Sequence, residues 1–328
     1  MSELITSDVS VAVEKLLSSH LCAIPTETVY GLAASAHDDV AIRRVFEAKG
    51  RPVNHPLIVH VADFQVALKW ISALPDWAIT LASKYWPGPL TLVGERTSLA
   101  TDLITGGQNT VAVRVPAHPQ VQQLLQELNS HGVQGIVAPS ANRFGHVSPT
   151  TCSHVSADLG AYLKAHDDAI LDGGACNVGI ESTIVSTTTD VPVILRPGYI
   201  TNSEIEAVTG RKPTNVNTSN IRISGNLSSH YSPQANVFIV NEGQSEEFRS
   251  DSGFLALRDV PTPSGVMRLD SPQTTEDFAT CLYSALRRAD ELNLKNIYVV
   301  IPQSDELSVA LLDRISRAAY RNDETIDL

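Results

Sequence analysis

Several familiar signatures are absent from this chain of 328 residues. It contains no Gly-x-x-x-x-Gly-Lys-Ser/Thr segment, no His-Glu-x-x-His and no Gly-x-Ser-x-Gly, which excludes a P-loop, that type of zinc peptidase and the nucleophile elbow of α/β-hydrolases. Its four cysteines have no Cys-x-x-Cys spacing, so the usual structural zinc pattern is excluded and no disulfide framework is indicated. A nucleotide would therefore need a different kind of cradle.

Long apolar runs and a basic charge balance are missing too. No run reaches the roughly 18 apolar residues that cross a bilayer, and residues 1–10 lack the basic and apolar regions of a signal peptide. The net charge is −12, whereas proteins whose main task is to bind nucleic acid are usually basic. Residues 237–328 carry 16 acidic and 9 basic side chains, so they are the weaker candidate for an RNA platform. We expect a soluble, cytoplasmic monomer without membrane contact.

Alternating patterns along the first 209 residues predict an α/β protein. Apolar residues at helical spacing predict helices over 9–18, 39–49, 75–85, 121–128 and 201–209. Short buried patterns predict strands over 20–24, 57–61, 90–93, 110–115, 135–138, 169–171, 182–186 and 193–195. Several strands follow one another directly, which favours a twisted mixed sheet with flanking helices.

The composition changes after residue 209. Residues 210–232 are rich in Gly, Ser, Thr and Asn and lack apolar periodicity, as is typical of a linker or mobile loop. Beyond them, strands over 237–240, 253–257 and 296–301 and helices over 274–292 and 306–320 predict a smaller Rossmann-like α/β unit without a glycine fingerprint. We therefore expect a catalytic domain over 1–200, a linker or lid over 201–236, and a C-terminal domain over 237–328.

Two short pieces combine cations with neutral hydrogen-bonding groups. Lys49 and Arg51 flank Gly50, which is expected to end a helix as a C-cap. Ser140 and Asn142 follow an apolar strand. Phosphate oxygens only accept hydrogen bonds, so this combination suits a polyanion site. The alternative is a solvated helix end whose cations favour the helix dipole.

A lone arginine, Arg114, lies inside the apolar alternation 110–115. Burying it is costly without an anion, which could be a structural acid or a ligand carboxylate. Residues 25–32 bring hydroxyls and one carboxylate to the end of a strand, where α/β sheets bind ligands. An ordinary strand-to-helix turn capped by a threonine would look the same. Residues 147–150, 172–183 and 195–198 are further turns, each unremarkable alone.

Together these segments resemble one enzyme family. In order they read Pro-Thr-Glu-Thr-Val-Tyr-Gly-Leu, Lys-x-Arg-Pro, Trp-Pro-Gly-Pro-Leu-Thr, Val-Ala-Val-Arg-Val-Pro, Pro-Ser-Ala-Asn and Ile-Glu-Ser-Thr-Ile. Over residues 5–235 the chain resembles the YrdC-like family of threonylcarbamoyl-AMP synthases, and its C-terminal unit is similar to that of the long, two-domain form.

The resemblance implies a reaction of L-threonine, bicarbonate or CO2, and ATP, with Mg2+ as cofactor, to threonylcarbamoyl-AMP and pyrophosphate. A separate threonylcarbamoyl transferase complex would then modify the adenosine next to the anticodon of ANN-decoding tRNAs. The implied threonine ligands are Thr28, His60, Arg114, Ala138 and Ser182. The implied ATP ligands are Lys49, Arg51, His55, Thr110, Ser140, Asn142, Ser148, Arg196 and Tyr231.

Within these sets the resemblance assigns distinct tasks. Lys49 and Arg51 would be catalytic, Arg114 would face the threonine carboxylate, and Ala138 would contribute backbone atoms. Tyr231 would close over ATP from the linker as a lid that excludes water. His55 stands where many members carry Asn, so its contribution could vary with pH. No general base is evident, and no resident metal ligand is expected.

Two alternatives remain at this stage. The first is a non-catalytic module that binds double-stranded RNA or tRNA through Arg43, Arg44, Lys49 and Arg51, for which the net charge of −12 is unfavourable. Weak tRNA contact by an active enzyme belongs to the same expectation. The second is a related carbamoyl-transfer domain, which normally accompanies zinc-finger-like cysteines that this chain lacks.

Overall fold

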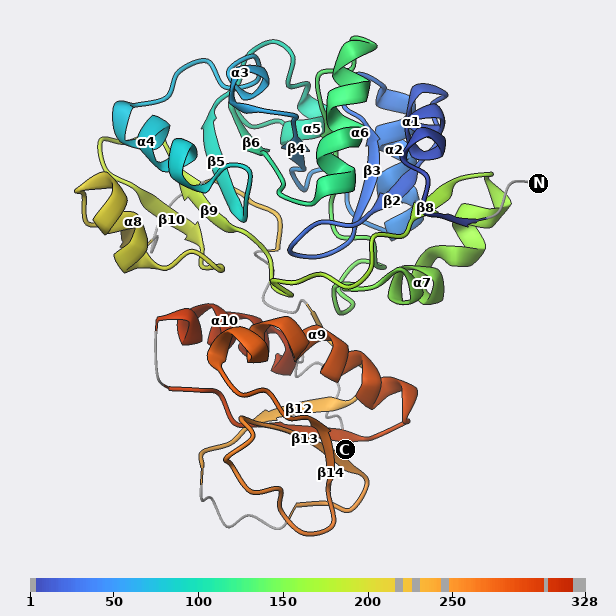
Figure 1. The fold of residues 1–328 in the computed structure, drawn as a ribbon, viewed down its shortest axis with the longest axis vertical. Coiled ribbons are helices and arrows are strands. Elements are labelled where there is room, and N and C mark those ends of the chain that lie inside the picture. Colours follow the sequence, from blue (N-terminus) through green and yellow to red (C-terminus); the bar gives the residue numbers. More distant parts are fainter. Residues whose placement is uncertain (1–3, 216–220, 226–230, 243–247, 304–305, 321–328) are drawn as a thin grey trace, which may run out of the picture.

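The computed structural model describes residues 4–215, 221–225, 231–242, 248–303 and 306–320. Within these ranges the chain forms two layered units, one above the other in Figure 1. The larger unit holds a mixed sheet of 11 strands, and the smaller unit holds a parallel sheet of 4 strands. This arrangement confirms the expected mixed α/β sheet with flanking helices and a smaller α/β unit.

The large sheet has the strand order β1-β8-β2-β3-β7-β4-β6-β5-β9-β10-β11. Parallel and antiparallel pairs are interspersed: β4 and β6 run parallel, whereas β2 and β3 run antiparallel. The strand bounds are β1 (Ile5–Thr6), β2 (Cys22–Ile24), β3 (Gly31–Ser35), β4 (Ile58–His60), β5 (Leu90–Glu95), β6 (Thr110–Arg114), β7 (Ile136–Val137), β8 (Ala169–Leu171), β9 (Thr183–Ser186), β10 (Val193–Arg196) and β11 (Thr214–Asn215).

Helices cover this sheet, and local capping explains where several of them begin. The Asp38 side chain accepts from the backbone at the start of α2, and Gly50 ends that helix in the left-handed conformation with φ 64°, as predicted. Thr201 and Glu204 form a capping box at the start of α8. The helices are α1 (Val9–Leu17), α2 (Asp39–Lys49), α3 (Phe64–Ala67), α4 (Asp76–Tyr85), α5 (Asp102–Thr105), α6 (Pro119–Ser130), α7 (Cys152–Ala165) and α8 (Asn202–Thr209).

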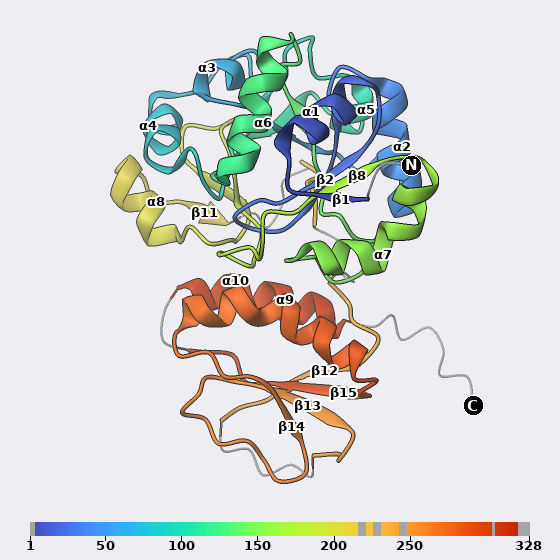
Figure 2. The ribbon, with the colours of Figure 1, turned by 45° about the vertical axis from the view of Figure 1, so that its right-hand side comes forward.

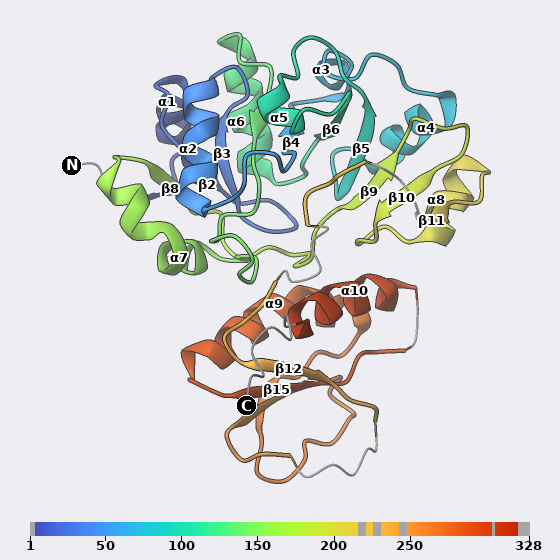
Figure 3. The same ribbon diagram turned by 180° about the vertical axis from the view of Figure 1, so that it is seen from behind.

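The smaller unit has the strand order β12-β15-β13-β14, all parallel. Its helices lie between the two sheets, as Figures 2 and 3 show from two further sides. Both helices therefore face the larger unit. The bounds are β12 (Asn236–Ile239), β13 (Ser252–Leu255), β14 (Met267–Asp270), α9 (Thr275–Glu291), β15 (Asn296–Val299) and α10 (Leu307–Ala319).

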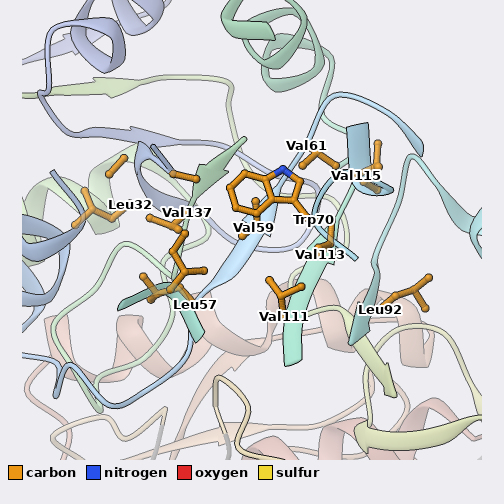
Figure 4. Close-up of a cluster of buried hydrophobic side chains, with 14 of the residues drawn as sticks. Leu32, Leu57, Val59, Val61, Trp70, Leu92, Val111, Val113, Val115 and Val137 are labelled. Atoms are coloured by element: carbon orange, nitrogen blue, oxygen red, sulfur yellow. The ribbon is translucent and has the colours of Figure 1, made fainter. Parts of the chain in front are cut away.

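One core cluster supports the centre of the large sheet. Valines of β4 and β6 lie beside the Trp70 ring (Figure 4). Trp70 is fully buried, and its indole N–H donates to the Gln134 carbonyl over 3.1 Å. A Cβ at Gly135 would lie 2.9 Å from Val59 and 3.2 Å from the Trp70 ring, so only glycine fits there. This packing fixes the strands whose ends form the site.

Seven elements were not expected from the sequence: β1, β3, β11, β14, α3, α5 and α7. Residues 25–30 lead into another strand, β3, and not into a helix. Small residues form most of β3, so it lacks the β-branched signal of a strand. Helix α7 was missed although Val155, Leu159 and Leu163 recur at helical spacing. The other five have no more than four residues each. No helix in the described ranges is long and apolar enough to cross a membrane.

Candidate active site

A pocket lies at the carboxyl ends of the parallel strands β4 and β6, where His60 pairs in register with Arg114. Turns from several other strands meet there, as expected for a ligand site in an α/β sheet. Of the predicted site residues, the pocket brings together Thr28, Lys49, Arg51, His60, Arg114, Ala138, Ser140, Asn142, Ser182, Arg196 and Tyr231. His55, Thr110 and Ser148 lie outside its lining.

Arg114 is held by the loop that follows β2. Its guanidinium donates to the Glu27 carboxylate over 2.6 Å and to the Thr28 hydroxyl over 2.9 Å. A third bond goes to the Gly88 carbonyl over 3.3 Å. The structural acid that a buried arginine requires is therefore Glu27. A guanidinium has five N–H donors, so a ligand carboxylate is not excluded by these three bonds.

His60 is buried beside Arg114. Burial first, and then the Arg114 charge, lowers the pKa of His60 to about 3. Its Nδ1 lies 3.3 Å from the Ile58 carbonyl oxygen, which only accepts hydrogen bonds. Nδ1 therefore carries the proton, and Nε2 of this neutral imidazole is an acceptor.

Lys49 and Arg51 are both buried. The alternative that they are solvent-exposed cations at the end of a helix is therefore wrong. The Lys49 ammonium donates to the Ser140 carbonyl over 2.5 Å and to the Asn142 carbonyl over 2.6 Å. Burial, and next the Arg51 charge, lowers the pKa of Lys49 well below its usual range. Arg51 donates to the Pro56 carbonyl over 2.9 Å, and burial lowers its pKa to about 10.

Arg196 at the end of β10 is a third buried cation of the same kind. It donates to the Ser182 carbonyl over 2.9 Å and to the Ser182 hydroxyl over 3.1 Å. A further bond reaches the Ser224 carbonyl over 3.1 Å. Among the described residues, no carboxylate oxygen lies within 4.0 Å of the charged nitrogens of Lys49, Arg51 or Arg196.

The turn after β7 packs tightly on β3. The Leu32 amide donates to the Pro139 carbonyl over 2.7 Å, and a Cβ at Gly31 would lie 3.0 Å from that of Ala138. The Asn142 amide group donates to the Arg143 and His146 carbonyls over 2.7 and 2.8 Å. These bonds hold the Ser140 and Asn142 carbonyls against Lys49.

The three predicted residues outside the lining remain close to lining residues. The His55 ring meets the Phe144 ring edge to face, with 5.4 Å between centroids, and Phe144 lines the pocket. Thr110 lines a neighbouring hollow that shares Ile58 and Ser224 with the pocket. Ser148 is fully buried, and its hydroxyl donates to the lining residue Glu181 over 2.8 Å.

Two other features considered from the sequence, the Gly173-Gly174 turn and the basic surface for RNA, have other surroundings than a ligand site would require. The glycines at 173 and 174 serve Tyr30 within the described residues: its hydroxyl donates to the Gly174 carbonyl over 2.8 Å and accepts from the Gly173 amide over 3.2 Å. Of the four cations named for the RNA-binding alternative, only Arg43 is exposed. Lys49 and Arg51 are buried, and Arg44 pairs with Asp168 at 2.7 Å. His230 of the segment that precedes Tyr231 lies outside the described residues.

Residues of the smaller unit reach this site, which we did not foresee. Arg314 of α10 and Tyr283 of α9 both bind the Glu181 carboxylate. A signal existed in the sequence: Arg314 continues the apolar stripe Leu307, Leu311, Ala318 of an otherwise amphipathic helix. A charged residue on the buried face of a helix indicates a buried partner.

No cluster of three or more His, Cys, Asp or Glu side chains suited to a metal ion occurs among the described residues. The carboxylates nearest the pocket, Glu27 and Glu181, are engaged by arginines. Because Mg2+ needs oxygen ligands in octahedral array, these residues do not fit a resident magnesium ion.

Comparisons with known proteins extend over both units. A Sua5/YciO/YrdC family model described as "Telomere recombination" matches residues 14–198, and one described as "Threonylcarbamoyl-AMP synthase, C-terminal domain" matches residues 200–320. A threonylcarbamoyl-AMP synthase of Pyrococcus abyssi is 37% identical, with 95% of this chain and 94% of that protein covered. One of Bacillus subtilis is 35% identical, with 97% and 95% covered.

A solved structure agrees with these relatives. The crystal structure of P. abyssi Sua5 complexed with L-threonine has a TM-score of 0.81 at 35% identity, with 95% of this chain and 94% of that chain covered. The similarity therefore extends over both units. The chain belongs to the Sua5/YrdC family of threonylcarbamoyl-AMP synthases, in the long form that carries the C-terminal domain.

Proposed function

We propose that the pocket of this chain converts L-threonine, bicarbonate or CO2, and ATP into threonylcarbamoyl-AMP and pyrophosphate. The observation that carries the proposal is the set of buried cations Lys49, Arg51 and Arg196, which have no carboxylate partner among the described residues. Buried charges are normally paired, so this arrangement supports a polyanionic ligand such as a triphosphate.

The threonine would lie on the Arg114 side of the pocket. Its carboxylate would meet Arg114, which Glu27 holds in one orientation at 2.6 Å. His60 Nε2 and the Thr28 hydroxyl provide acceptors for the amine or hydroxyl of threonine. Ser182 and the backbone of Ala138 complete this side, since both line the pocket.

The ATP would extend from the three cations toward the linker. Lys49, Arg51 and Arg196 would lie along the phosphates, and Ser140, Asn142 and Tyr231 line the same space. Ile58 and the linker residue Ser224 line both the pocket and the neighbouring hollow that Thr110 lines. A nucleotide that contacts Thr110 would therefore pass beside the linker. His55 and Ser148 would act at the edge of the site, through Phe144 and Glu181.

The chemistry suits these residue types. The threonine amine attacks CO2 and loses a proton to give a carbamate. A carbamate oxygen then attacks the α-phosphorus of ATP, and the bond to pyrophosphate breaks. Negative charge moves onto phosphate oxygens, so positioning and fixed cations can supply the catalysis. Mg2+ would arrive bound to ATP, and the linker would keep water from the mixed anhydride.

The product suits a second enzyme. Threonylcarbamoyl-AMP is an activated acyl donor, and a separate threonylcarbamoyl transferase complex would pass its acyl group to the adenosine next to the anticodon of ANN-decoding tRNAs. Within this chain we propose the division into residues 1–200, 201–236 and 237–328, with the middle part as the lid. Direct contact with tRNA is not required for the reaction.

The decisive test is pyrophosphate release by the purified chain with Mg2+-ATP, in the presence and absence of L-threonine and bicarbonate. We expect release only when both are present, together with a product whose mass equals threonylcarbamoyl-AMP. Release without threonine would refute the proposed acceptor. A folded protein that releases no pyrophosphate but binds RNA with a steep salt dependence would favour the binding-module alternative.

A further inference from the structure

Glu181 lines the pocket, and its carboxylate is bound by residues of both units. One of its oxygens accepts from the Ser148 hydroxyl over 2.8 Å. The other accepts from the Tyr283 hydroxyl over 2.6 Å and from Arg314 Nε over 2.8 Å. Burial alone would raise the pKa of Glu181, but the Arg314 and Arg196 charges lower it to about 2. Glu181 is therefore an anion at neutral pH, with every neighbour donating to it.

Arg314 connects this carboxylate to two further parts of the site. Its side chain is fully buried, and Nη2 donates to the Pro197 carbonyl over 2.8 Å, directly after Arg196. Its guanidinium carbon lies 5.4 Å from the centroid of the Tyr231 ring. One side chain of α10 thus contacts the Glu181 turn, the Arg196 turn and the linker.

Tyr231 is held in an unusual conformation at this junction. Its φ is 60°, a left-handed backbone that costs a non-glycine residue on the order of 1–3 kcal/mol. The ring is buried and stacks on Tyr283 of α9, with 5.4 Å between centroids. Two residues that contact the ring, Tyr283 and Arg314, thus come from the smaller unit.

We propose that Arg314 is a positioning residue of the active site, through which the C-terminal domain sets Glu181, the Ser148 hydroxyl and the Tyr231 ring for ATP. The domain thereby supplies part of the ATP site. Arg114 is fixed by Glu27, and the Ser182 hydroxyl is held by Thr91 over 2.7 Å, so neither depends on Arg314 directly.

This role differs from that of an ordinary interface contact. Among the described residues, the other hydrogen bonds between the units, such as the Ser203 amide to Glu306 over 3.0 Å and Arg287 Nε to the Ser148 carbonyl over 3.4 Å, do not involve residues that line the pocket. Arg317, one turn further along α10, pairs with Asp313 at 2.9 Å within the helix. It is the same residue type on the same helix, so Arg317→Met serves as a matched control for Arg314→Met.

The experiment measures steady-state pyrophosphate release and, separately, binding of a non-hydrolysable ATP analogue and of L-threonine by calorimetry. We expect Arg314→Met to raise both KM and Kd for the nucleotide at least tenfold, while Kd for threonine changes less than twofold. Arg317→Met should leave all three constants within twofold. The kinetic measurement rests on the proposed function. The two binding measurements test the role of Arg314 even if the chain shows no turnover.

Two further variants keep the inference falsifiable if Arg314→Met folds poorly. Arg314→Lys retains the charge beside Glu181 and should recover part of the nucleotide affinity. Glu181→Gln combined with Arg314→Met should be no worse than Arg314→Met alone, because the two residues act as one unit. Equal losses of nucleotide and threonine affinity in folded Arg314→Met would overturn the proposal. Unchanged nucleotide affinity in both Arg314 variants would also overturn it.

Discussion

The two sides of the pocket hold their buried cations in opposite ways. On the threonine side, Arg114 meets a carboxylate at 2.6 Å. On the phosphate side, Lys49, Arg51 and Arg196 are as deeply buried, yet only neutral oxygens of the described residues bind them. A cation buried without a counter-ion destabilises the folded protein. We therefore propose that the phosphate side takes an anion that arrives with the substrate, and that Glu27 fixes the orientation of Arg114 on the threonine side.

The largest expected effect is on the rate of pyrophosphate release and comes from removing a cation of the phosphate side. Lys49→Met should lower the rate of pyrophosphate release by on the order of 1,000-fold, as loss of a charged group at a developing negative charge does. Methionine fills much of the same space without a buried charge, so the melting temperature should stay within a few degrees. Calorimetric binding of L-threonine should be unchanged. A large drop in melting temperature, with full activity per folded molecule, would instead make Lys49 a structural residue.

The second prediction concerns stability, for which the substitution on the threonine side should have the larger effect. Arg114→Met leaves Glu27 buried without its partner, which should reduce the free energy of unfolding by about 3–5 kcal/mol. The double variant Glu27→Gln/Arg114→Met should recover most of this loss, because no unpaired charge remains. Urea unfolding followed by circular dichroism measures all three proteins. A loss no larger than that in Lys49→Met would show that the two sides do not differ.

The third prediction uses ligands in place of substitutions. Pyrophosphate should raise the free energy of unfolding of the wild-type chain, by about 2.7 kcal/mol at 100 times its Kd. Lys49→Met should lose this stabilisation, and Glu27→Gln/Arg114→Met should keep it. L-Threonine should give the opposite pattern across the same variants. Thermal unfolding at fixed ligand concentrations provides the measurement, and equal responses to both ligands would contradict a two-sided pocket.

The sequence indicated the phosphate side better than the elements that position it. The sequence predicted the turn at Lys49, Gly50 and Arg51 because a glycine after a helical pattern is a local signal for a helix end. The structure shows Gly50 in the left-handed conformation at that position. Helix α7 and strand β3 were missed, since Gly160 and the small residues of β3 weaken the usual periodicity. Their formation depends on packing against distant elements, which local propensity does not report.

The residue pattern alone left the partner of Arg114 open, and the resemblance assigned it the threonine carboxylate. The structural partner Glu27 was missed for a related reason. Glu27 is separated from Arg114 by 86 intervening residues and comes from a loop whose course depends on the unforeseen strand β3. The contribution of the C-terminal domain was hidden in the same way. Arg314 and Tyr283 reach Glu181 only because α9 and α10 face the larger unit, a contact that no local pattern near Glu181 encodes.

The smallest expected effect concerns pH and belongs to the threonine side. Because burial and then the Arg114 charge lower the pKa of His60 to about 3, the unfolded chain binds one more proton than the folded chain between about pH 6.5 and 3. Stability supplied by neutral His60 is thus present above pH 6.5 and is lost as pH falls, by up to about 1.4 kcal/mol per unit.

The matched variant is His60→Gln, whose side-chain amide can still donate to the Ile58 carbonyl. Going from pH 7 to pH 5, the wild type should lose more unfolding free energy than this variant, although both share every other titrating group. The pH dependence of pyrophosphate release should have the same shape near pH 6.5 in the wild type and in His60→Gln. An inflection near pH 6.5 that is present in the wild type and absent from His60→Gln would mean that His60 gains a proton in the working enzyme. In that case Arg114 would not dominate the charge of this side, and the contrast between the two halves of the pocket would weaken.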